Sequence, residues 1–170
     1  MHLILGGARS GKSSRALALS DQAGLVDGRQ KVFVASAQAF DDEMQHRIKV
    51  HQGERDSTWD LMEAPLDLAD TIAQMDARHI VLIDCLTLWL SNVMLADLDV
   101  AAHCADLVTA LCASPAQLYI VSNEVGMGLI PETPLGRAFR DAQGRLNQQV
   151  AAAATVVEFV VAGLPLRLKG

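Results

Sequence analysis

Eight residues near the start of the chain have the types and spacing needed to bind a phosphate group. They follow a short apolar run at residues 3–5 and read G-x-x-x-x-G-K-S. Glycines let backbone N–H groups curl around an anion without a clashing Cβ, and a helix N-terminus at the loop's exit also favours phosphate. The motif predicts that its lysine contacts the β- and γ-phosphates of a nucleotide and that its serine binds Mg²⁺. Its residues are Gly6, Gly7, Ala8, Arg9, Ser10, Gly11, Lys12 and Ser13.

The context of this motif decides between a phosphate site and a glycine-rich turn that binds nothing. An apolar strand precedes it, and residues 14–19 contain no helix breaker. Strand, loop and helix therefore occur in the order that phosphate binding requires.

A carboxylate closes a second apolar run. Residues 79–83 are mostly β-branched or apolar, and Asp84 follows them. An acid at the end of a strand contacts Mg²⁺ in many nucleotide-binding proteins, although it also serves as a turn former or helix cap. Because the chain also has the glycine loop, we interpret Asp84 as a magnesium ligand.

The stretch Asn123-Glu124-Val125-Gly126 lies where a GTP-binding switch protein would carry N-K-x-D. The lysine and aspartate of that motif are both missing, which argues against a switch protein. Asn123 and Glu124 remain as polar groups at the end of a strand, either as ligands of substrate or metal or as hydrogen-bonding groups that fix the next loop.

A helix predicted over residues 41–52 begins with acids and ends with bases, which suits the helix dipole. Met44, Ile48 and His51 share one face at spacings of four and three, whereas His46 lies off that face. From spacing alone, His51 is either a chemical group or a structural histidine at a helix end.

The wider pattern predicts an α/β fold. Apolar runs at residues 3–5, 31–35, 79–83 and 118–121 alternate with helical patterns at 13–22, 41–52, 66–77, 85–96, 100–113 and 134–153. Such alternation is typical of a buried, mostly parallel sheet with helices on both faces. Residues 156–161 and 166–168, joined by a turn at 162–165, predict a hairpin at the sheet edge. The loop around residues 125–128 is a candidate lid.

Composition limits the classes of function. The chain has 170 residues with 51% apolar content, enough for one core, so we expect a single domain over residues 1–170. Its net charge of −6 argues against a nucleic-acid partner. The three cysteines, Cys85, Cys104 and Cys112, form neither a C-x-x-C pair nor a zinc pattern. No apolar run is long enough to span a membrane, and no secretion signal is evident. We therefore expect a cytoplasmic protein.

Several motifs taken together resemble one family. The glycine loop, Ala35-Ser36-Ala37-Gln38, the stretch from Asp41 to His51, and Asn123 to Gly128 all carry the likeness, as does the stretch 139–148. The family is the bifunctional adenosylcobinamide kinase / adenosylcobinamide-phosphate guanylyltransferase, and the resemblance spans nearly the whole chain.

The resemblance implies an activity and a set of site residues. Members phosphorylate adenosylcobinamide, a corrinoid, with a nucleoside triphosphate, either GTP or ATP. They then transfer GMP from GTP to the product through a GMP-histidine intermediate. The histidine that carries GMP in the family matches His51 of this chain. A neutral imidazole is nucleophilic near pH 7 without an activating base. The resemblance also implies a homotrimer with a RecA-like P-loop sheet. The nucleotide contacts that it implies are residues 6–13, Ala35, Ser36, Ala37, Gln52, Gly53, Glu54, Arg55, Glu63 and Asp84.

Two other functions remain open from the residues themselves. One is a P-loop small-molecule kinase with a single activity, in which His51 is structural. The other is a regulatory NTP-binding module, against which the missing N-K-x-D counts.

Overall fold

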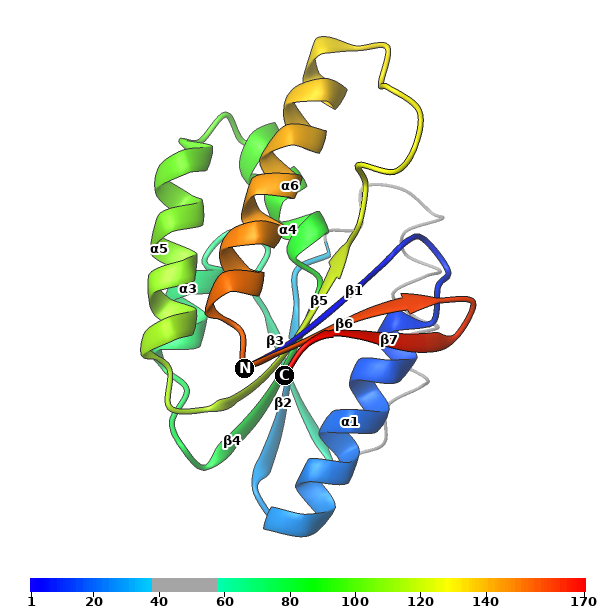
Figure 1. The fold of residues 1–170 in the computed structure, drawn as a ribbon. Coiled ribbons are helices and arrows are strands. Elements are labelled where there is room, and N and C mark those ends of the chain that lie inside the picture. The colour runs from blue at the N-terminus through cyan, green and yellow to red at the C-terminus, as the bar shows by residue number, and fades with distance from the viewer. Residues whose placement is uncertain (38–57) are drawn as a thin grey trace.

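A computed structural model describes residues 1–37 and 58–170 of the chain (Figure 1). The described strands form one seven-stranded sheet in the order β3-β2-β4-β5-β1-β6-β7. All neighbours pair in parallel except β6 and β7, which are antiparallel. The strands are β1 (His2–Gly6), β2 (Gln30–Ala35), β3 (Trp59–Glu63), β4 (His79–Asp84), β5 (Gln117–Asn123), β6 (Val156–Val161) and β7 (Leu164–Lys169).

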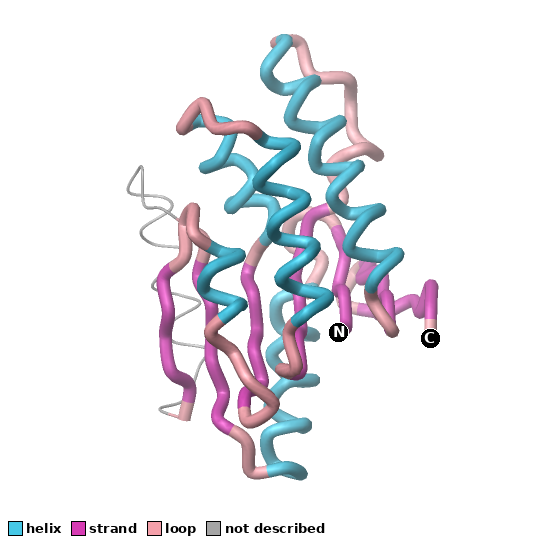
Figure 2. The backbone as a smooth tube through the Cα atoms, turned by 90° about the vertical axis from the view of Figure 1, so that its left-hand side faces the viewer, coloured by secondary structure: helices cyan, strands magenta, loops and turns pink. Residues whose placement is uncertain are grey.

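The helices cover both faces of this sheet, as the alternating pattern predicted. Figures 1 and 2 show α1 on one face and the other described helices on the opposite face. The central strands are buried between these layers, and residues 80–83 of β4 are at most 1% exposed. The described helices are α1 (Lys12–Asp27), α3 (Leu68–Ala73), α4 (Leu86–Leu95), α5 (Val100–Ala113) and α6 (Pro134–Ala153).

Most expected elements are confirmed, with some different bounds. The helix predicted over 13–22 runs five residues further, until Gly28 adopts a left-handed conformation with φ 62° and donates to the Gly24 carbonyl. The helix predicted over 66–77 is limited to α3, residues 68–73. The helix predicted over 41–52 lies outside the described residues.

One strand, β3, was missed by the sequence pattern. Three of its five residues are exposed because β3 lies at the outer edge of the sheet. An edge strand of this kind needs neither a continuous apolar run nor a strict alternation. At the other edge the expected hairpin is confirmed, with a tighter turn at Ala162-Gly163 and with β7 starting at Leu164.

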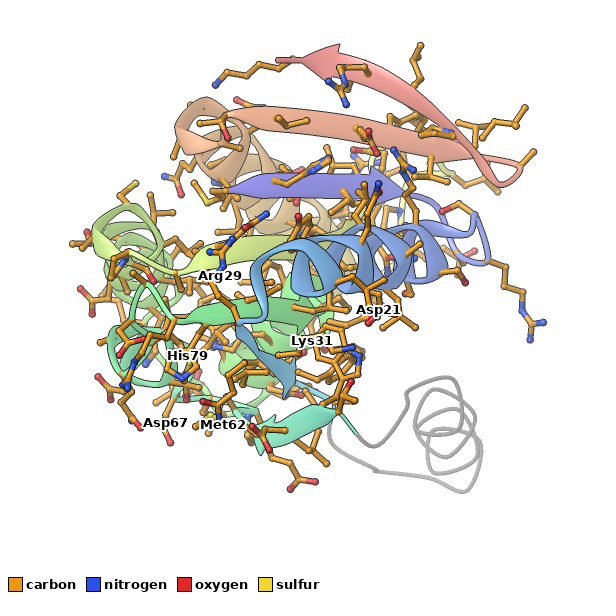
Figure 3. The ribbon with its side chains drawn as sticks, turned by 90° about the horizontal axis from the view of Figure 1, so that it is seen from below. Asp21, Arg29, Lys31, Met62, Asp67 and His79 are labelled. Carbon is orange, nitrogen blue, oxygen red and sulfur yellow. The ribbon has the colours of Figure 1, made fainter. Side chains whose placement is uncertain are left out.

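Charged and aromatic side chains join α1 to β2 and β3. The ammonium of Lys31 lies 2.6 Å from an Asp21 carboxylate oxygen (Figure 3), and the indole of Trp59 donates to the same oxygen at 3.1 Å. Lys31 also lies 4.8 Å from the centre of the Trp59 ring, within the range of a cation–π interaction. The outer strand is therefore held to the helix that follows the glycine loop.

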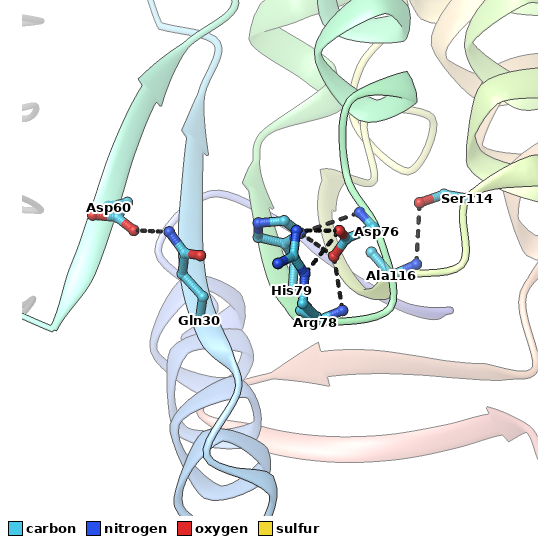
Figure 4. Close-up of polar contacts among 7 residues, drawn as sticks. All are labelled: Gln30, Asp60, Asp76, Arg78, His79, Ser114 and Ala116. Atoms are coloured by element: carbon cyan, nitrogen blue, oxygen red, sulfur yellow. Dashed lines mark hydrogen bonds and ion pairs between the residues drawn. The ribbon is translucent and has the colours of Figure 1, made fainter.

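Polar side chains form a separate set of contacts at the amino ends of the strands (Figure 4). The Gln30 amide donates to Asp60 across β2 and β3 at 2.7 Å. Just before β4, Asp76 accepts from the Arg78 guanidinium at 2.7 Å, and this bond lowers the pKa of Asp76 to about 2. These groups stabilise the end of the sheet opposite to the glycine loop.

A buried carboxylate on β6 links three elements. Glu158 is 2% exposed and accepts two hydrogen bonds from Arg15 of α1, at 2.9 and 3.0 Å. Arg167 of β7 lies 3.4 Å from the same carboxylate, so α1, β6 and β7 share one ionic cluster. The Arg15 hydrogen bond is the main reason that the pKa of Glu158 is lowered.

No helix in the part of the chain that the structure describes is long and apolar enough to cross a membrane.

The Glu158 cluster predicts a specific loss of stability. Arg15→Met removes the bidentate partner of a buried carboxylate but keeps an apolar side chain. Because Arg15 is partly exposed, we expect the free energy of unfolding at pH 7 to fall by about 2 to 3 kcal/mol, at or just below the lower end of the range of about 3 to 5 kcal/mol for broken buried pairs. Urea unfolding measures the change, and the double variant Arg15→Met/Glu158→Leu should recover much of it.

The same cluster predicts a pH dependence. Since folding lowers the pKa of Glu158, its contribution is complete above the pKa of the unfolded glutamate and is lost as the pH falls through the folded value. The difference between wild type and Arg15→Met should therefore shrink below about pH 4. An equal unfolding midpoint of the two proteins at pH 7 would contradict this account.

Candidate active site

The glycine loop leaves β1 and enters α1 directly. Gly11 caps the helix with φ 93°, a left-handed conformation that suits glycine, and its carbonyl accepts the N–H of Arg15 at 2.9 Å. Lys12 reaches back over the loop, and its ammonium donates to the Gly7 carbonyl at 3.2 Å. The loop thus combines free N–H groups of a helix N-terminus with a cation, which is the arrangement that suits an anion.

Two other elements hold this loop in place. The N–H of Gly163, in the β6–β7 turn, donates to the Ser10 carbonyl at 2.8 Å, and the N–H of Glu124 donates to the Gly6 carbonyl at 3.1 Å. A Cβ on Gly11 would lie 3.2 Å from the Gly163 Cα, so the turn packs closely against the loop. Among the described residues the buried Ser10 hydroxyl makes no hydrogen bond.

The ends of β2 and β4 lie on the same edge of the sheet as the loop. Ala35 and Asp84 are register partners, and Asp84 is only partly buried. Burial, together with the nearby Asp84 charge, raises the pKa of Cys85 to about 12, while the positive charge of Lys12 opposes this rise. Lys12 is therefore within electrostatic range of the end of β4, and Cys85 is a neutral thiol rather than a nucleophile.

Ser36 has a role that its sequence position did not indicate. It is fully buried, its hydroxyl donates to the Cys85 carbonyl at 2.6 Å, and it accepts the Cys85 N–H at 3.0 Å. The Asn92 amide of α4 donates to the Ser36 carbonyl at 2.8 Å and to the Pro65 carbonyl at 3.0 Å. The Ser36 hydroxyl thus fixes the ends of β2 and β4. Asn92 helps to hold the same backbone, and the sequence analysis missed it although it is a polar residue in a mostly apolar helix.

Glu63 lies further out on the same edge. It is the register partner of Ala35 and is exposed at the end of β3. Four strand spacings separate it from β1, or about 19 Å. The structure therefore places Ala35, Glu63 and Asp84 in one row beside the loop, with Glu63 at its far end. His51, Gln52, Gly53, Glu54 and Arg55 lie outside the described residues.

A buried polar network supports the end of β5, and sequence reasoning missed most of it. Gln143 is fully buried and donates to the hydroxyl of Ser122 at 3.0 Å and to Asn147 at 2.9 Å. Asn147 in turn donates to the Asn123 carbonyl at 3.0 Å. Gln143 and Asn147 lie on the buried face of α6 next to apolar residues. Two polar residues on an otherwise apolar helix face were the sequence signal that could have indicated this network.

The described residues contain no group of three or more His, Cys, Asp and Glu side chains that could hold a metal ion. The donors expected for Mg²⁺ here are a hydroxyl, from Ser13, and one carboxylate, from Asp84. Such a sparse set of oxygen donors suits Mg²⁺, which keeps waters and takes further ligands from nucleotide phosphates.

These features define an α/β protein whose glycine-rich loop opens at the carboxyl edge of a mostly parallel sheet. Residues 2–168 match the family model described as cobinamide kinase / cobinamide phosphate guanyltransferase, and the chain belongs to this family. The resemblance seen in the motifs is thereby confirmed.

Curated relatives agree with this assignment. The chain is 43% identical to the bifunctional adenosylcobalamin biosynthesis protein CobP of Pseudomonas aeruginosa over 173 residues, which cover 99% of this chain and 96% of that protein. It is 38% identical over 185 residues to the bifunctional adenosylcobalamin biosynthesis protein CobU of Escherichia coli, with 99% of both chains covered. The protein of that name from Salmonella typhimurium is 37% identical over 186 residues, again with 99% of both covered.

The loop geometry predicts the effect of removing its cation. Lys12→Ala deletes the ammonium that lies over the loop, so a bound phosphate would lose its nearest positive charge. We expect kcat/KM to fall by ~10² or more for every reaction that uses a nucleotide at this loop. Steady-state kinetics and nucleotide binding measure the change. Near-normal binding and turnover in a folded Lys12→Ala protein would contradict the assignment of the phosphate site.

Proposed function

We propose that this chain phosphorylates adenosylcobinamide with GTP or ATP and then transfers GMP from GTP to the product. The second step gives adenosylcobinamide-GDP and pyrophosphate. The observation that carries the proposal is the braced glycine loop with Lys12 over it, beside Asp84, in a chain that matches the kinase / guanyltransferase family along nearly its whole length. The loop is, in this proposal, the P-loop of a RecA-like nucleotide-binding domain over residues 1–170.

In the kinase step the substrate hydroxyl oxygen attacks the γ-phosphorus. A new O–P bond forms, the bond to the β-phosphate oxygen breaks, and the hydroxyl proton leaves to solvent or a nearby base. Backbone N–H groups of residues 6–13 hold the phosphates, and the Lys12 ammonium stabilises the charge that develops on them. The buried Ser10 hydroxyl, which makes no hydrogen bond to the residues that the structure describes, supports a polar ligand at this loop.

Ser13 and Asp84 are the residues that would hold Mg²⁺, and the bound ion would neutralise phosphate charge during transfer. Ala35, Ala37 and Glu63 are proposed to contact the rest of the nucleotide. Ser36 is fully buried, so its part in this proposal is to fix the strand ends beneath the ligand. The row formed by Ala35, Glu63 and Asp84 along the sheet edge supports this proposal.

In the guanylyl step we assign the nucleophile to His51. An imidazole nitrogen attacks the α-phosphorus of GTP, a P–N bond forms, and the α–β bond breaks to release pyrophosphate. An oxygen of adenosylcobinamide phosphate then attacks the same phosphorus, so the P–N bond breaks and the histidine is restored. Gln52, Gly53, Glu54 and Arg55 are proposed to contact GTP next to it. The support for these roles is the sequence resemblance.

We also propose that the protein works in the cytoplasm as a homotrimer. The edge strand β7 supports an assembly, because Leu164, Leu166 and Leu168 are 73%, 59% and 58% exposed on it. Unpaired strand edges with large apolar side chains commonly become interfaces.

The magnesium role of Asp84 predicts a selective defect. Asp84→Asn deletes the carboxylate and preserves its shape, so Mg²⁺-dependent turnover should fall more than nucleotide binding. Raising the Mg²⁺ concentration should restore part of the rate. Titrating Mg²⁺ against turnover measures this, and an unchanged Mg²⁺ requirement would show that the acid only ends the strand.

His51 separates the bifunctional enzyme from a kinase with one activity. His51→Ala should abolish both the covalent GMP adduct and the transfer of GMP, whereas phosphorylation of adenosylcobinamide should partly survive, because that step needs the loop, Mg²⁺ and the hydroxyl. Mass spectrometry after incubation with GTP and Mg²⁺ detects the adduct, which should be labile in acid and stable in alkali.

His46→Ala is the matched control, since the sequence predicts that His46 lies off the face that Met44, Ile48 and His51 would share. It should retain both activities. A folded His51→Ala protein that still forms the adduct, or still makes adenosylcobinamide-GDP at a comparable rate, would overturn the role of His51.

A further inference from the structure

The loop between β5 and α6 exposes large apolar side chains beside the candidate active site. Met127 is 81% exposed, Leu129 96% and Ile130 70%. Figure 1 shows this loop, in yellow, standing above the end of β5 and reaching the start of α6. Three adjacent apolar side chains with so much contact to water are unusual on a soluble surface unless a ligand or partner covers them.

The position of this loop connects it to the phosphate site. Asn123, the last residue of β5, is the register partner of Gly6, which opens the glycine loop. The next residue, Glu124, donates its N–H to the Gly6 carbonyl at 3.1 Å. The exposed apolar side chains therefore begin within four residues of a backbone contact with the phosphate loop.

The loop is braced at both ends. The Glu124 carboxylate accepts the N–H of Gly126 and that of Met127, the latter at 3.2 Å, and a Cβ on Gly126 would lie 2.8 Å from that carboxylate. At the other end the Arg137 guanidinium donates to the carbonyls of Pro131 and Glu132 at 3.0 and 2.7 Å. The apolar side chains are thus presented on a fixed backbone, which lowers the entropy lost when a ligand binds.

We infer that Met127, Leu129 and Ile130 form the docking surface for the corrin ring of the substrate, an inference that rests on the proposed function. A corrin is a broad macrocycle whose rim carries both methyl groups and amide arms, and the reacting hydroxyl lies at the end of one arm. The ring itself lies outside the nucleotide loop while the arm reaches the phosphate, and its methyl-bearing surface can pack on apolar side chains there.

The test compares Leu129→Ser/Ile130→Ser with wild type. The KM for adenosylcobinamide should rise at least ~10-fold, because apolar contact with the ring is lost. The KM for GTP and the formation of the GMP adduct from GTP alone should not change, which also shows that the variant is folded. Leu25→Ser is the matched control, since Leu25 is 89% exposed on α1, and it should leave all of these values unchanged.

Each outcome distinguishes this inference from the proposed function. If wild type neither binds adenosylcobinamide in equilibrium dialysis nor phosphorylates it, the proposed function fails and the docking surface fails with it. If wild type turns over normally and the double variant keeps its KM for adenosylcobinamide, only the docking surface is overturned. If Leu129→Ser/Ile130→Ser changes only the sedimentation of the protein and not its kinetics, the loop makes contacts between copies of the chain. That result would also overturn the inference.

Discussion

The ionic cluster around Glu158 is the constraint on which the glycine loop depends. Glu158 lies on β6, yet its main partner, Arg15, lies on the first turns of the helix that the loop caps. Burying a carboxylate costs much free energy unless a charged partner such as Arg15 is bound to it. This pairing therefore fixes the direction of α1 relative to the sheet. The β6–β7 turn adds the Gly163 bond to Ser10. A hairpin near the end of the chain therefore holds a loop near its beginning.

Polar side chains, rather than apolar ones, shape the carboxyl edge of the sheet. Ser36 and Asn92 fix the ends of β2 and β4, while Gln143 and Asn147 fix the end of β5. Buried groups of this kind are costly unless they are hydrogen-bonded, so they specify one arrangement of the backbone. Strand ends held in this way can present Asp84 to a charged ligand with little reorganisation, which is the property that transfer chemistry needs.

The sequence predicted those parts of the fold that follow from local pattern. The continuous apolar run of β4 indicated a buried parallel strand, and the motif at residues 6–13 indicated the loop between β1 and α1. Edge strand β3 carried no such pattern, because an exposed edge does not require one. The partners of Ser36 and Gln143 come from segments far apart in the chain, and no local pattern specifies such pairings. The roles of His51 and residues 52–55 stay predictions from sequence.

The place of β1 in the strand order has a consequence for local opening of the molecule. β1 pairs with β5 on one side and β6 on the other, whereas β7 is exposed along its whole length. Native-state hydrogen exchange reports the free energy of opening each segment, and central strands generally open only with the whole domain. The backbone amides of β1 should therefore be among the slowest to exchange, and those of β7 among the fastest. The glycine loop is therefore anchored to one of the segments expected to open last, so local fraying at the sheet edges leaves that anchor intact.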